Sequence, residues 1–464
     1  MARQVSGTLT ANDTWSDTIE VTADFNVPSG IQLTIAPGTT VKVREGQFVL
    51  LGAGSTVNAI GNSTSRITFT TVQDDSVGED LTGPTAGVPK AGHWESLYVD
   101  SSNVNFDFAD VRYAGNQHNP GHGGGFVPSV FVRSGTLQNF KHIRLSDGDS
   151  TGFEFQSNTS PVLDAISIER TRQVAINQAV SANPSYKGLS LLTSGGSYIN
   201  LQPGSIPGNR SWDFDNATVH INGDLVVPAD TTLNLAPGTI LKFSNGSYLY
   251  ADGTLNAIGT ATKPIVFTSL LDDTAGGDTN NDGAATTGGP GQWETIYVDS
   301  STSKLDNVEI RFAGNLHNPG HGGGRVAALN IRGSSPTVTN TRIFKGENNG
   351  IDITGASNPT IQTVSILNSG GYAIYQELVA NPSYLGLDLR NNNSNSIQLQ
   401  GGNVSGSKKF NFGGIPAVLT TDLNVPTGSS LELVPGTILK FRMAGLQPIT
   451  RLLARSLLRQ TRII

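Results

Sequence analysis

Residues 335–374 read SPTVTNTRIFKGENNGIDITGASNPTIQTVSILNSGGYAI. In this stretch, short runs of alternating apolar and polar residues are separated by Gly, Asn, Ser and Pro at short intervals. Alternation with a period of two predicts β-strands, and Gly, Asn, Ser and Pro favour the turns between them. The stretch therefore has the pattern of successive turns of a β-solenoid, each coil being roughly 20–25 residues long.

The same pattern extends from residue 1 to residue 441, and no long amphipathic helix interrupts it. A β-sandwich or a β-barrel also consists of alternating strands, but aromatic residues make up only 7% of this sequence, and small polar residues occupy the turns. A parallel β-solenoid stacks small aliphatic side chains inside and places Asn, Ser and Gly at its corners. We therefore predict an all-β parallel β-helix that rises about 4.8 Å per coil.

A longer repeat is superimposed on the coils. The sequence NVPSGIQLTIAPGTTVKV at 26–43 returns as VVPADTTLNLAPGTILKF at 226–243 and as NVPTGSSLELVPGTILKF at 424–441. The offsets of 198 to 200 residues predict two tandem units of about 200 residues and the start of a third. The expected segments are unit 1 (1–209), unit 2 (210–408), the start of unit 3 (409–441) and an atypical tail (442–464).

The tail differs from the rest of the chain in composition. RMAGLQPITRLLARSLLRQTRII contains five arginines and no acidic residue. One interpretation is a cationic amphipathic helix that contacts a membrane or a partner. The other is a truncated or frame-shifted gene end, because the tail interrupts a strand motif that continues in the second unit. We favour the second interpretation and assign the tail no function.

Residues 235–314 combine LAPGTILKF, PIVFTS, GDTNNDG, GQWETIYVDSS and LDNVEIRFAG. In this combination the chain resembles the right-handed parallel β-helix repeats of large bacterial surface proteins, which share the pectin-lyase-like fold. The resemblance covers both units, up to Phe441. It implies the fold but no single function, since that fold hosts lyases, hydrolases, phage tailspikes and adhesin stalks.

Composition narrows the range of partners. The 464-residue chain has 14% charged residues and a formal net charge of −7, so it lacks the basic surface that binds nucleic acids or anionic membranes. It has no cysteine, which excludes disulfides and thiol chemistry. No apolar run approaches the roughly 18 residues that span a bilayer. The N-terminus lacks the apolar stretch of a signal peptide, so either an export signal lies outside these residues or the protein stays inside the cell.

Two nearly identical loops, GNQHNPGHGGG at 115–125 and GNLHNPGHGGG at 314–324, contain four of the seven histidines. Paired imidazoles can bind a transition metal, and such loops can also contact a glycan or another ligand. The simpler interpretation is a tight Asn-Pro-Gly turn, whose glycines let the chain re-enter the solenoid. The candidate ligand-binding residues are His118, Asn119, His122, His317, Asn318 and His321.

A second candidate is the loop DDTAGGDTNNDG at residues 272–283. Its second part fits D-x-N-x-D-G, the first half of a calcium-binding loop, in which Asp and Asn oxygens wrap a hard cation. It departs from the EF-hand because position 12 is Gly289 and no Glu closes the site, and the first unit loses the motif. Solvated carboxylates are the alternative to a structural calcium. The expected calcium ligands are Asp272, Asp273, Asp278, Asn280 and Asp282.

A third candidate is an active site for polysaccharide cleavage, which needs carboxylates gathered on one solvent-facing sheet. Acid–arginine pairs two residues apart share a strand face and satisfy part of this requirement. The structural alternative is a surface ion pair, with each nearby tryptophan packed beneath a loop. We therefore assign no catalytic residue from the sequence. The candidates are Asp110 with Arg112, Glu309 with Arg311, and Trp94 and Trp293 as sugar-stacking side chains.

Together these features lead us to expect a non-enzymatic, extracellular or cell-surface protein, namely a β-helical stalk or adhesin of bacterial type. Its loops would bind a polysaccharide or a surface protein, and it would join end to end with further repeats of the same protein. No cofactor is required beyond the structural calcium. The alternatives are a polysaccharide lyase or glycoside hydrolase of the pectin-lyase-like fold, and a phage tail fibre or tailspike.

Overall fold

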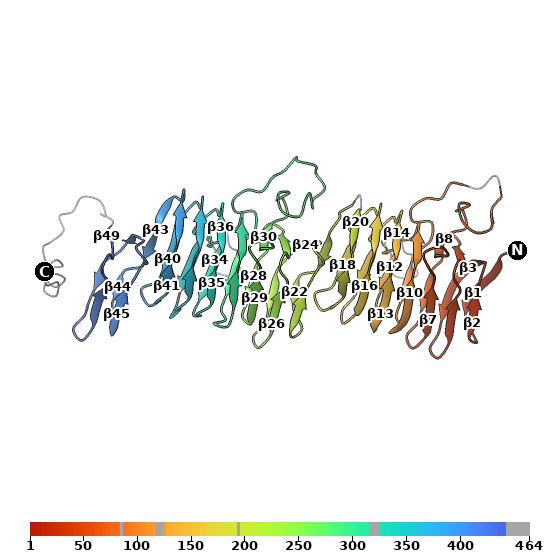
Figure 1. The fold of residues 1–464 in the computed structure, drawn as a ribbon, viewed down its shortest axis with the longest axis horizontal. Helices are drawn as coiled ribbons and strands as arrows, with labels where there is room; N and C mark the ends of the chain where they lie inside the picture. The colour runs from red at the N-terminus through yellow and green to blue at the C-terminus, as the bar shows by residue number, and fades with distance from the viewer. Residues whose placement is uncertain (84–86, 117–124, 126, 193–194, 316–323, 442–464) are drawn as a thin grey trace.

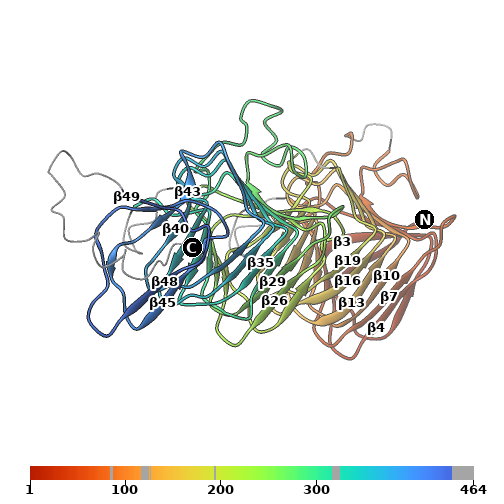
Figure 2. The same ribbon diagram turned by 60° about the vertical axis from the view of Figure 1, so that its left-hand side comes forward.

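The computed structural model describes residues 1–441 apart from 84–86, 117–124, 126, 193–194 and 316–323. The regular elements in this part of the chain are β-strands, named β1 to β49, which pair in parallel. They stack into an elongated rod, with β1 and β49 toward opposite ends (Figures 1 and 2). The predicted all-β parallel β-helix is therefore confirmed. The described residues contain no helix that could span a lipid bilayer.

Each coil contributes one strand to each of three faces, which we number in the order in which the chain meets them. In the N-terminal half, residues 1–209, the 10-residue strand β3 takes part in faces 1 and 2. Face 1 consists of β1 (Arg3–Thr8), β3 (Thr18–Val27), β5 (Thr40–Val43), β8 (Ile67–Thr71), β11 (Ala109–Arg112), β14 (Arg144–Ser146), β17 (Ser167–Glu169) and β20 (Ser190–Leu192). Face 2 consists of the second part of β3 together with β6 (Val49–Leu51), β9 (Leu97–Val99), β12 (Val130–Val132), β15 (Phe153–Phe155), β18 (Ile176–Gln178) and β21 (Ile199–Leu201). Face 3 consists of β2 (Asp13–Trp15), β4 (Gln32–Ile35), β7 (Thr56–Ile60), β10 (Asn103–Asp107), β13 (Thr136–Lys141), β16 (Ser160–Asp164) and β19 (Ser185–Lys187).

The C-terminal half, residues 210–441, follows the same scheme, and β22 starts its face 2 just before this boundary. Face 1 consists of β24 (Thr218–Ile221), β27 (Ile240–Phe243), β30 (Ile265–Ser269), β33 (Val308–Arg311), β36 (Arg342–Phe344), β39 (Ser365–Leu367) and β42 (Asp388–Arg390). Face 2 consists of β22 (Gly204–Ser205), β25 (Leu225–Val227), β28 (Leu249–Ala251), β31 (Ile296–Val298), β34 (Leu329–Arg332), β37 (Ile351–Thr354), β40 (Tyr372–Gln376), β43 (Ser394–Leu399), β46 (Ala417–Leu419) and β49 (Leu439–Phe441). Face 3 consists of β23 (Arg210–Trp212), β26 (Thr232–Leu235), β29 (Thr254–Ile258), β32 (Lys304–Asp306), β35 (Thr337–Thr339), β38 (Thr360–Gln362) and β41 (Ser383–Leu385). Two short pairs complete the last coils: β44 (Gly402–Asn403) with β47 (Leu423–Asn424), and β45 (Ser407–Phe410) with β48 (Ser430–Leu433).

The two halves are joined by a continuous sheet. β21 is the last strand of face 2 in the N-terminal half, and it pairs with β24, the first strand of face 1 in the C-terminal half. The sheet that begins as face 2 therefore continues as face 1, and no strand pairing crosses the junction from β19 or β20 among the described residues.

Aliphatic columns along the rod form its core. Leu33, Val57 and Val104 occupy matching positions on three successive strands of face 3, and each is fully buried. Successive side chains of a strand point to opposite faces, so the residues between them point outward. Burying each such side chain contributes about 1.5–3 kcal/mol, which explains how a chain without disulfides holds this shape.

The corners between faces 3 and 1 depend on left-handed backbone geometry. In the C-terminal half this position is taken by Asn307, Asn340, Thr363 and Gly386, with φ between 46° and 64°. Gly reaches this conformation without steric cost, and Asn does so more readily than most other residues. This explains why Asn and Gly recur at coil-length intervals in the sequence.

Two long excursions leave the rod between faces 1 and 2, at residues 72–96 and 270–295. Both rise from the upper side of the rod in Figures 1 and 2. Each ends near a fully buried tryptophan. The Trp94 Nε1–H donates to the Arg112 carbonyl at 2.7 Å, and the Trp293 Nε1–H donates to the Arg311 carbonyl at 2.6 Å.

Candidate functional site

The excursion of the C-terminal half contains an acidic cluster. Carboxylate oxygens of Asp273, Asp278 and Asp282 all lie within 4.8 Å of one another. Burial raises the pKa of Asp273, and the charge of Asp278 raises it further. The Oδ1 atoms of Asp273 and Asn280 are buried and accept no hydrogen bond from the described residues. These oxygen ligands fit the chemistry of a hard cation such as calcium.

The structure brings together only part of the calcium set expected from the sequence. Asn280 donates to the Asp282 carboxylate at 2.7 Å, so it belongs to the cluster. Asp272 lies apart from it and is buried at the end of β30, where it accepts from Thr268 Oγ1 at 2.7 Å and pairs with Arg311 at 3.2 Å. Asp272 therefore anchors the start of the excursion instead of serving the cluster.

A buried lysine holds the acidic loop from beneath. The Lys242 Nζ donates to the Gly277 carbonyl at 2.6 Å, and burial lowers the pKa of this lysine to about 8 despite the nearby aspartates. Lys42 makes the corresponding contacts in the N-terminal half, to the carbonyls of Asp74 at 2.9 Å and Glu79 at 2.5 Å. The lysine is thus a structural clamp common to both halves.

The remaining candidates from the sequence are the histidine loops, the tryptophans and the acid–arginine pairs. His118, Asn119, His122, His317, Asn318 and His321 lie outside the described residues. Trp94 and Trp293 are fully buried, so the hypothesis that they stack on sugars is wrong. Their positions at the ends of the excursions turn both rings into the core.

The acid–arginine pairs lie on face 1, where they neutralise each other. Asp110 is 5% exposed and accepts from Arg66 at 2.7 Å and from Arg112 at 3.3 Å. Glu309 pairs with Arg311, which also reaches Asp272. Guanidinium groups are paired with both carboxylates. This is the ion pair that the sequence allowed as the alternative to an active site.

A row of reactive side chains instead follows the outer surface of face 2 in the C-terminal half. Tyr250, Tyr297, Asn330, Asp352 and Tyr375 occupy matching positions on the successive strands β28, β31, β34, β37 and β40. A second row lies two residues further along each strand. We call the two rows together the polar platform: Tyr250, Asp252, Tyr297, Asp299, Asn330, Arg332, Asp352, Thr354, Tyr375 and Glu377.

Asp352, Tyr375 and Glu377 form the most reactive part of the platform. All three side chains are partly exposed. Burial raises the pKa of Asp352 to about 6, although a hydrogen bond from Asn349 at 2.9 Å opposes the shift. Burial also raises the pKa of Tyr375, and the negative charges of Glu377 and Asp352 add to this effect. The phenol therefore lies within the field of both carboxyl groups.

The neighbouring part of the platform is a rigid aromatic and ionic cluster. The Arg332 guanidinium lies 4.3 Å from the centroid of the Tyr297 ring and 5.2 Å from that of Tyr250. It also forms two hydrogen bonds of 2.9 Å to the Asp299 carboxylate. The Tyr250 hydroxyl donates to Asp299 at 3.1 Å. Such bidentate and stacked contacts hold the arginine in one orientation.

The N-terminal half repeats the aromatic and ionic cluster, but it has no counterpart of the Glu377 carboxylate. Arg133 pairs with Asp100 at 2.7 and 2.9 Å and lies 4.5 Å from the centroid of the Tyr98 ring. Glu154 occupies the position that corresponds to Asp352, and burial raises its pKa as well. Ala179, however, stands where the C-terminal half has Glu377. The pair of acids is therefore peculiar to the C-terminal half.

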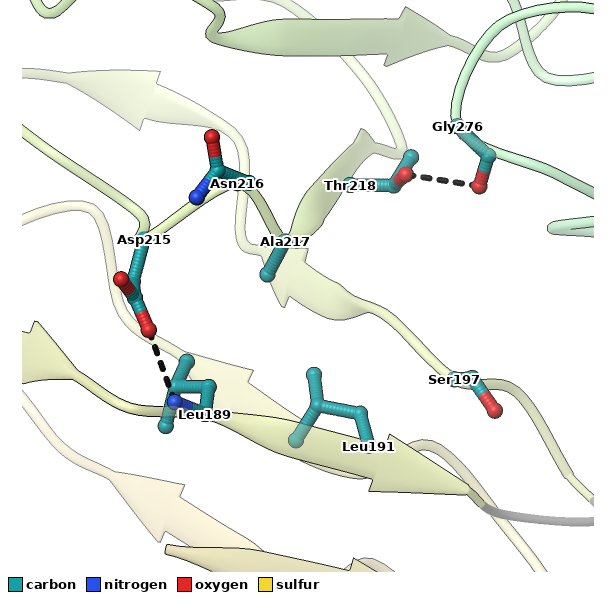
Figure 3. Close-up of a pocket in the computed structure, with 8 residues that line it drawn as sticks. All are labelled: Leu189, Leu191, Ser197, Asp215, Asn216, Ala217, Thr218 and Gly276. Carbon is teal, nitrogen blue, oxygen red and sulfur yellow. Dashed lines mark hydrogen bonds between the residues drawn. The ribbon is translucent and has the colours of Figure 1, made fainter. Parts of the chain in front are cut away.

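A hollow of about 470 Å³ lies at the junction of the two halves (Figure 3). Asp215 Oδ2 accepts from the Leu189 N–H at 2.7 Å, and Thr218 Oγ1 donates to the Gly276 carbonyl at 2.9 Å. Asp215 is the one ionisable residue among those that line it, so the hollow offers no pair of acids. Its lining residues are Leu189, Leu191, Ser197, Asp215, Asn216, Ala217, Thr218 and Gly276.

The sequence did not single out Asp352, Tyr375 and Glu377, yet it carries a signal for them. Asp352 and Tyr375 are 23 residues apart, which is one coil, and both occupy outward positions of their strands. A search for polar and aromatic residues that recur at this interval on the outward positions would have found the row. The acid–arginine spacing of two residues pointed to face 1 instead.

Comparison with known proteins finds likenesses of low identity among solved structures. No protein-family model matches the chain, and no curated protein matches it. Solved structures that match include the alginate lyase of Paenibacillus sp. str. FPU-7, with 13% identity and a TM-score of 0.19 over 76% of this chain and 93% of that chain. The A-module of the Azotobacter vinelandii mannuronan C-5 epimerase AlgE4 matches with 11% identity and a TM-score of 0.25, over 86% and 89%. The catalytic domain of a GH87 α-1,3-glucanase in complex with nigerose matches with 13% identity and a TM-score of 0.23, over 94% and 64%.

At these identities the likeness concerns the fold alone. The matched proteins are enzymes that act on polysaccharides, and this finding corrects two expectations from the sequence: that the protein is a non-enzymatic stalk or adhesin, and that it is not an enzyme. Strand alternation and tandem duplication led to those expectations, but both describe the scaffold and are silent on its outer surface. The chain forms a parallel β-helix, which is the fold that its resemblance to the pectin-lyase-like proteins implies.

Proposed function

We propose that this protein hydrolyses glycosidic bonds in a polysaccharide, and that the polar platform of face 2 is its active site. The observation that carries the proposal is the placement of two carboxyl groups, Asp352 and Glu377, on adjacent strands beside the partly exposed Tyr375. Glycoside hydrolysis requires one carboxyl group that donates a proton and one carboxylate that activates water.

Asp352 is the general acid in this mechanism. With a pKa of about 6, its carboxyl group stays protonated in mildly acidic solution, where an ordinary aspartate is ionised. It donates its proton to the glycosidic oxygen as the bond from that oxygen to the anomeric carbon breaks. This is the environment in which a carboxyl group acts as an acid, because burial disfavours its charged form.

Glu377 is the general base. It accepts a hydrogen bond from the Gly355 N–H at 2.7 Å, which holds the carboxylate at the edge of the platform next to Thr354. It takes a proton from water as the water oxygen attacks the anomeric carbon. Asp352 and Glu377 lie one strand and two residues apart, which places their Cα atoms about 8 Å from each other.

Tyr375 and Tyr250 supply partly exposed rings for binding the sugar chain. Aromatic rings pack well against the apolar faces of sugars, and the partly exposed Thr354 offers a hydroxyl group for hydrogen bonds to sugar hydroxyls. We further propose that the protein acts outside the cell, where such polymers are found, and that its two sequence units are 1–209 and 210–408. The start of a third unit, 409–441, is part of the same proposal.

A structural calcium ion belongs to this proposal as well. The ligands would be Asp273, Asp278, Asn280 and Asp282, whose oxygens include two buried acceptors that receive no hydrogen bond from the described residues. The ion would neutralise the charge of the acidic loop and hold the excursion in place. It would take no part in the reaction, because the loop belongs to the excursion and not to the platform.

The proposal is tested with Asp352→Asn and Glu377→Gln, assayed on polysaccharides by the release of reducing ends. Each substitution should lower kcat by about 10²–10⁴-fold, because it removes a proton donor or acceptor from the transition state. The matched control is Glu154→Gln, at the corresponding position of the N-terminal half, which should retain activity. Equal activity of Asp352→Asn and the unmodified protein contradicts the proposed site. Circular dichroism verifies that each variant is folded.

A further inference from the structure

The polar platform carries a strong excess of negative charge. Its acidic side chains are Asp252, Asp299, Asp352 and Glu377, and its single basic side chain among the described residues is Arg332. Asp252 lies near enough to Tyr250 to raise the pKa of that phenol, after the larger effects of burial and Asp299. The negative charges therefore extend along the platform beyond the pair of acids that the reaction uses.

The single arginine is already paired with a carboxylate of the platform. Both hydrogen bonds from Arg332 to Asp299 are 2.9 Å long, and the guanidinium is packed between the rings of Tyr250 and Tyr297. The Arg332 side chain is 41% exposed, so a substrate carboxylate that reached it would lie beside the Asp299 carboxylate. Displacing Asp299 would break two charge-assisted hydrogen bonds.

The group of acidic side chains that could hold a cation belongs to the acidic loop and not to the platform. Among the described residues, the group of three acidic side chains with oxygens close enough to share an ion lies in the acidic loop: Asp273, Asp278 and Asp282. The acidic residues of the platform do not form such a group.

We propose that the platform selects an uncharged polysaccharide, and that polyuronates and other anionic polymers are excluded by repulsion. This inference rests on the proposed function and specifies its substrate class. It also favours hydrolysis over β-elimination. A lyase acts on a uronate whose carboxylate must be neutralised in the transition state, and a negatively charged platform does not supply that neutralisation. The uncharged side chain of Thr354 is partly exposed, as is that of Gln398, which lies beside Tyr375 on the next strand, β43, and both suit sugar hydroxyls instead.

The first experiment compares uncharged and charged polymers directly. The protein is incubated with glucans, xylan, mannan and galactan, and with polygalacturonate and alginate, and both reducing ends and unsaturated products are measured. Reducing ends from an uncharged polymer, with none or far fewer from the uronates, support the inference. Efficient hydrolysis of a uronate overturns it but leaves the proposed hydrolase intact. Unsaturated products, or no products from any polymer, overturn the hydrolase and the inference together.

The second experiment isolates charge from sugar identity. The uncharged polymer that is cleaved best is compared with its own carboxymethylated derivative, with and without a calcium chelator. The KM of the derivative should be about tenfold higher at low salt, and this ratio should shrink toward one as salt screens the charges. Asp252→Asn should reduce the ratio several-fold, because it removes one of the repelling charges. A ratio near one at low salt, or one that grows with salt, contradicts the inference.

Discussion

The strongest prediction concerns the stability of Asp352→Asn, because the proposed acid should weaken the fold that holds it. The folded-state pKa of Asp352 is about 6, against 3.8 for an ordinary aspartate. Linkage between ionisation and folding converts this difference into about 3 kcal/mol that the ionised carboxylate costs the folded state. Asn is uncharged and keeps an oxygen that can accept from Asn349, so the variant should recover most of that energy.

The sign and the pH window follow from the direction of the shift. Below pH 3.8 the carboxyl group is protonated in both the folded and the unfolded states, so it costs nothing. Between pH 3.8 and about 6 the unfolded chain releases its proton while the folded protein retains it, and the free energy of unfolding falls. Above pH 6 the full cost is present. Asp352→Asn should therefore be more stable at pH 7.5 by up to about 3 kcal/mol, with the difference vanishing near pH 3.5.

The assay is urea denaturation of the unmodified protein and of Asp352→Asn at both pH values, followed by circular dichroism. Glu154→Gln is a useful reference, since burial raises the pKa of Glu154 as well and the same sign is expected. A variant that is less stable than the unmodified protein at pH 7.5 refutes the reasoning. A stability difference that is equal at the two pH values refutes it too, because ionisation would then not be its cause.

Three further predictions concern the reaction, the acidic loop and the core. The rate of hydrolysis should fall about tenfold for each pH unit above 6, as Asp352 loses its proton, which a pH–rate profile measures. Millimolar calcium should raise the melting temperature of the unmodified protein but not that of Asp278→Asn. The control is Asp80→Asn in the N-terminal half, which should respond as the unmodified protein does. A rise in the melting temperature of Asp278→Asn contradicts the calcium site. Trp293→Phe should lower the free energy of unfolding by about 1–3 kcal/mol, because the Arg311 carbonyl loses its 2.6 Å hydrogen bond. The measurement is urea denaturation, and an unchanged free energy of unfolding would show that water replaces the lost donor.

Strand type and coil length could be predicted from sequence because both are local properties. Alternation in Thr254–Ile258, for example, places Leu255 and Ala257 in the core, and both are fully buried. Asn and Gly take left-handed corners of the C-terminal half because they adopt positive φ at low cost, whereas Phe108, His142 and Ala165 take the corresponding corners of the N-terminal half. These preferences act within a few residues and need no knowledge of neighbouring coils.

The reactive surface depended on the stacking of coils, which the sequence does not state directly. Arg332 and Asp299 are 33 residues apart, whereas Asp352 and Tyr375 are 23 apart, because the coil between β31 and β34 contains a longer loop. Unequal coil lengths conceal the rows that a constant interval would reveal. The tryptophans show the same effect, since only the path of each excursion decides whether Trp94 and Trp293 face solvent or the core.

The parallel β-helix and the acidic loop could therefore be predicted from residues that are close together in the chain, and the repeat of about 200 residues from motifs that recur 198 to 200 residues apart. The tertiary structure decided which outward side chains become neighbours on face 2, and which carboxylates are already paired with arginine on face 1. The physical reason is that backbone pairing between coils sets the lateral register, and burial by those neighbours sets the pKa of Asp352.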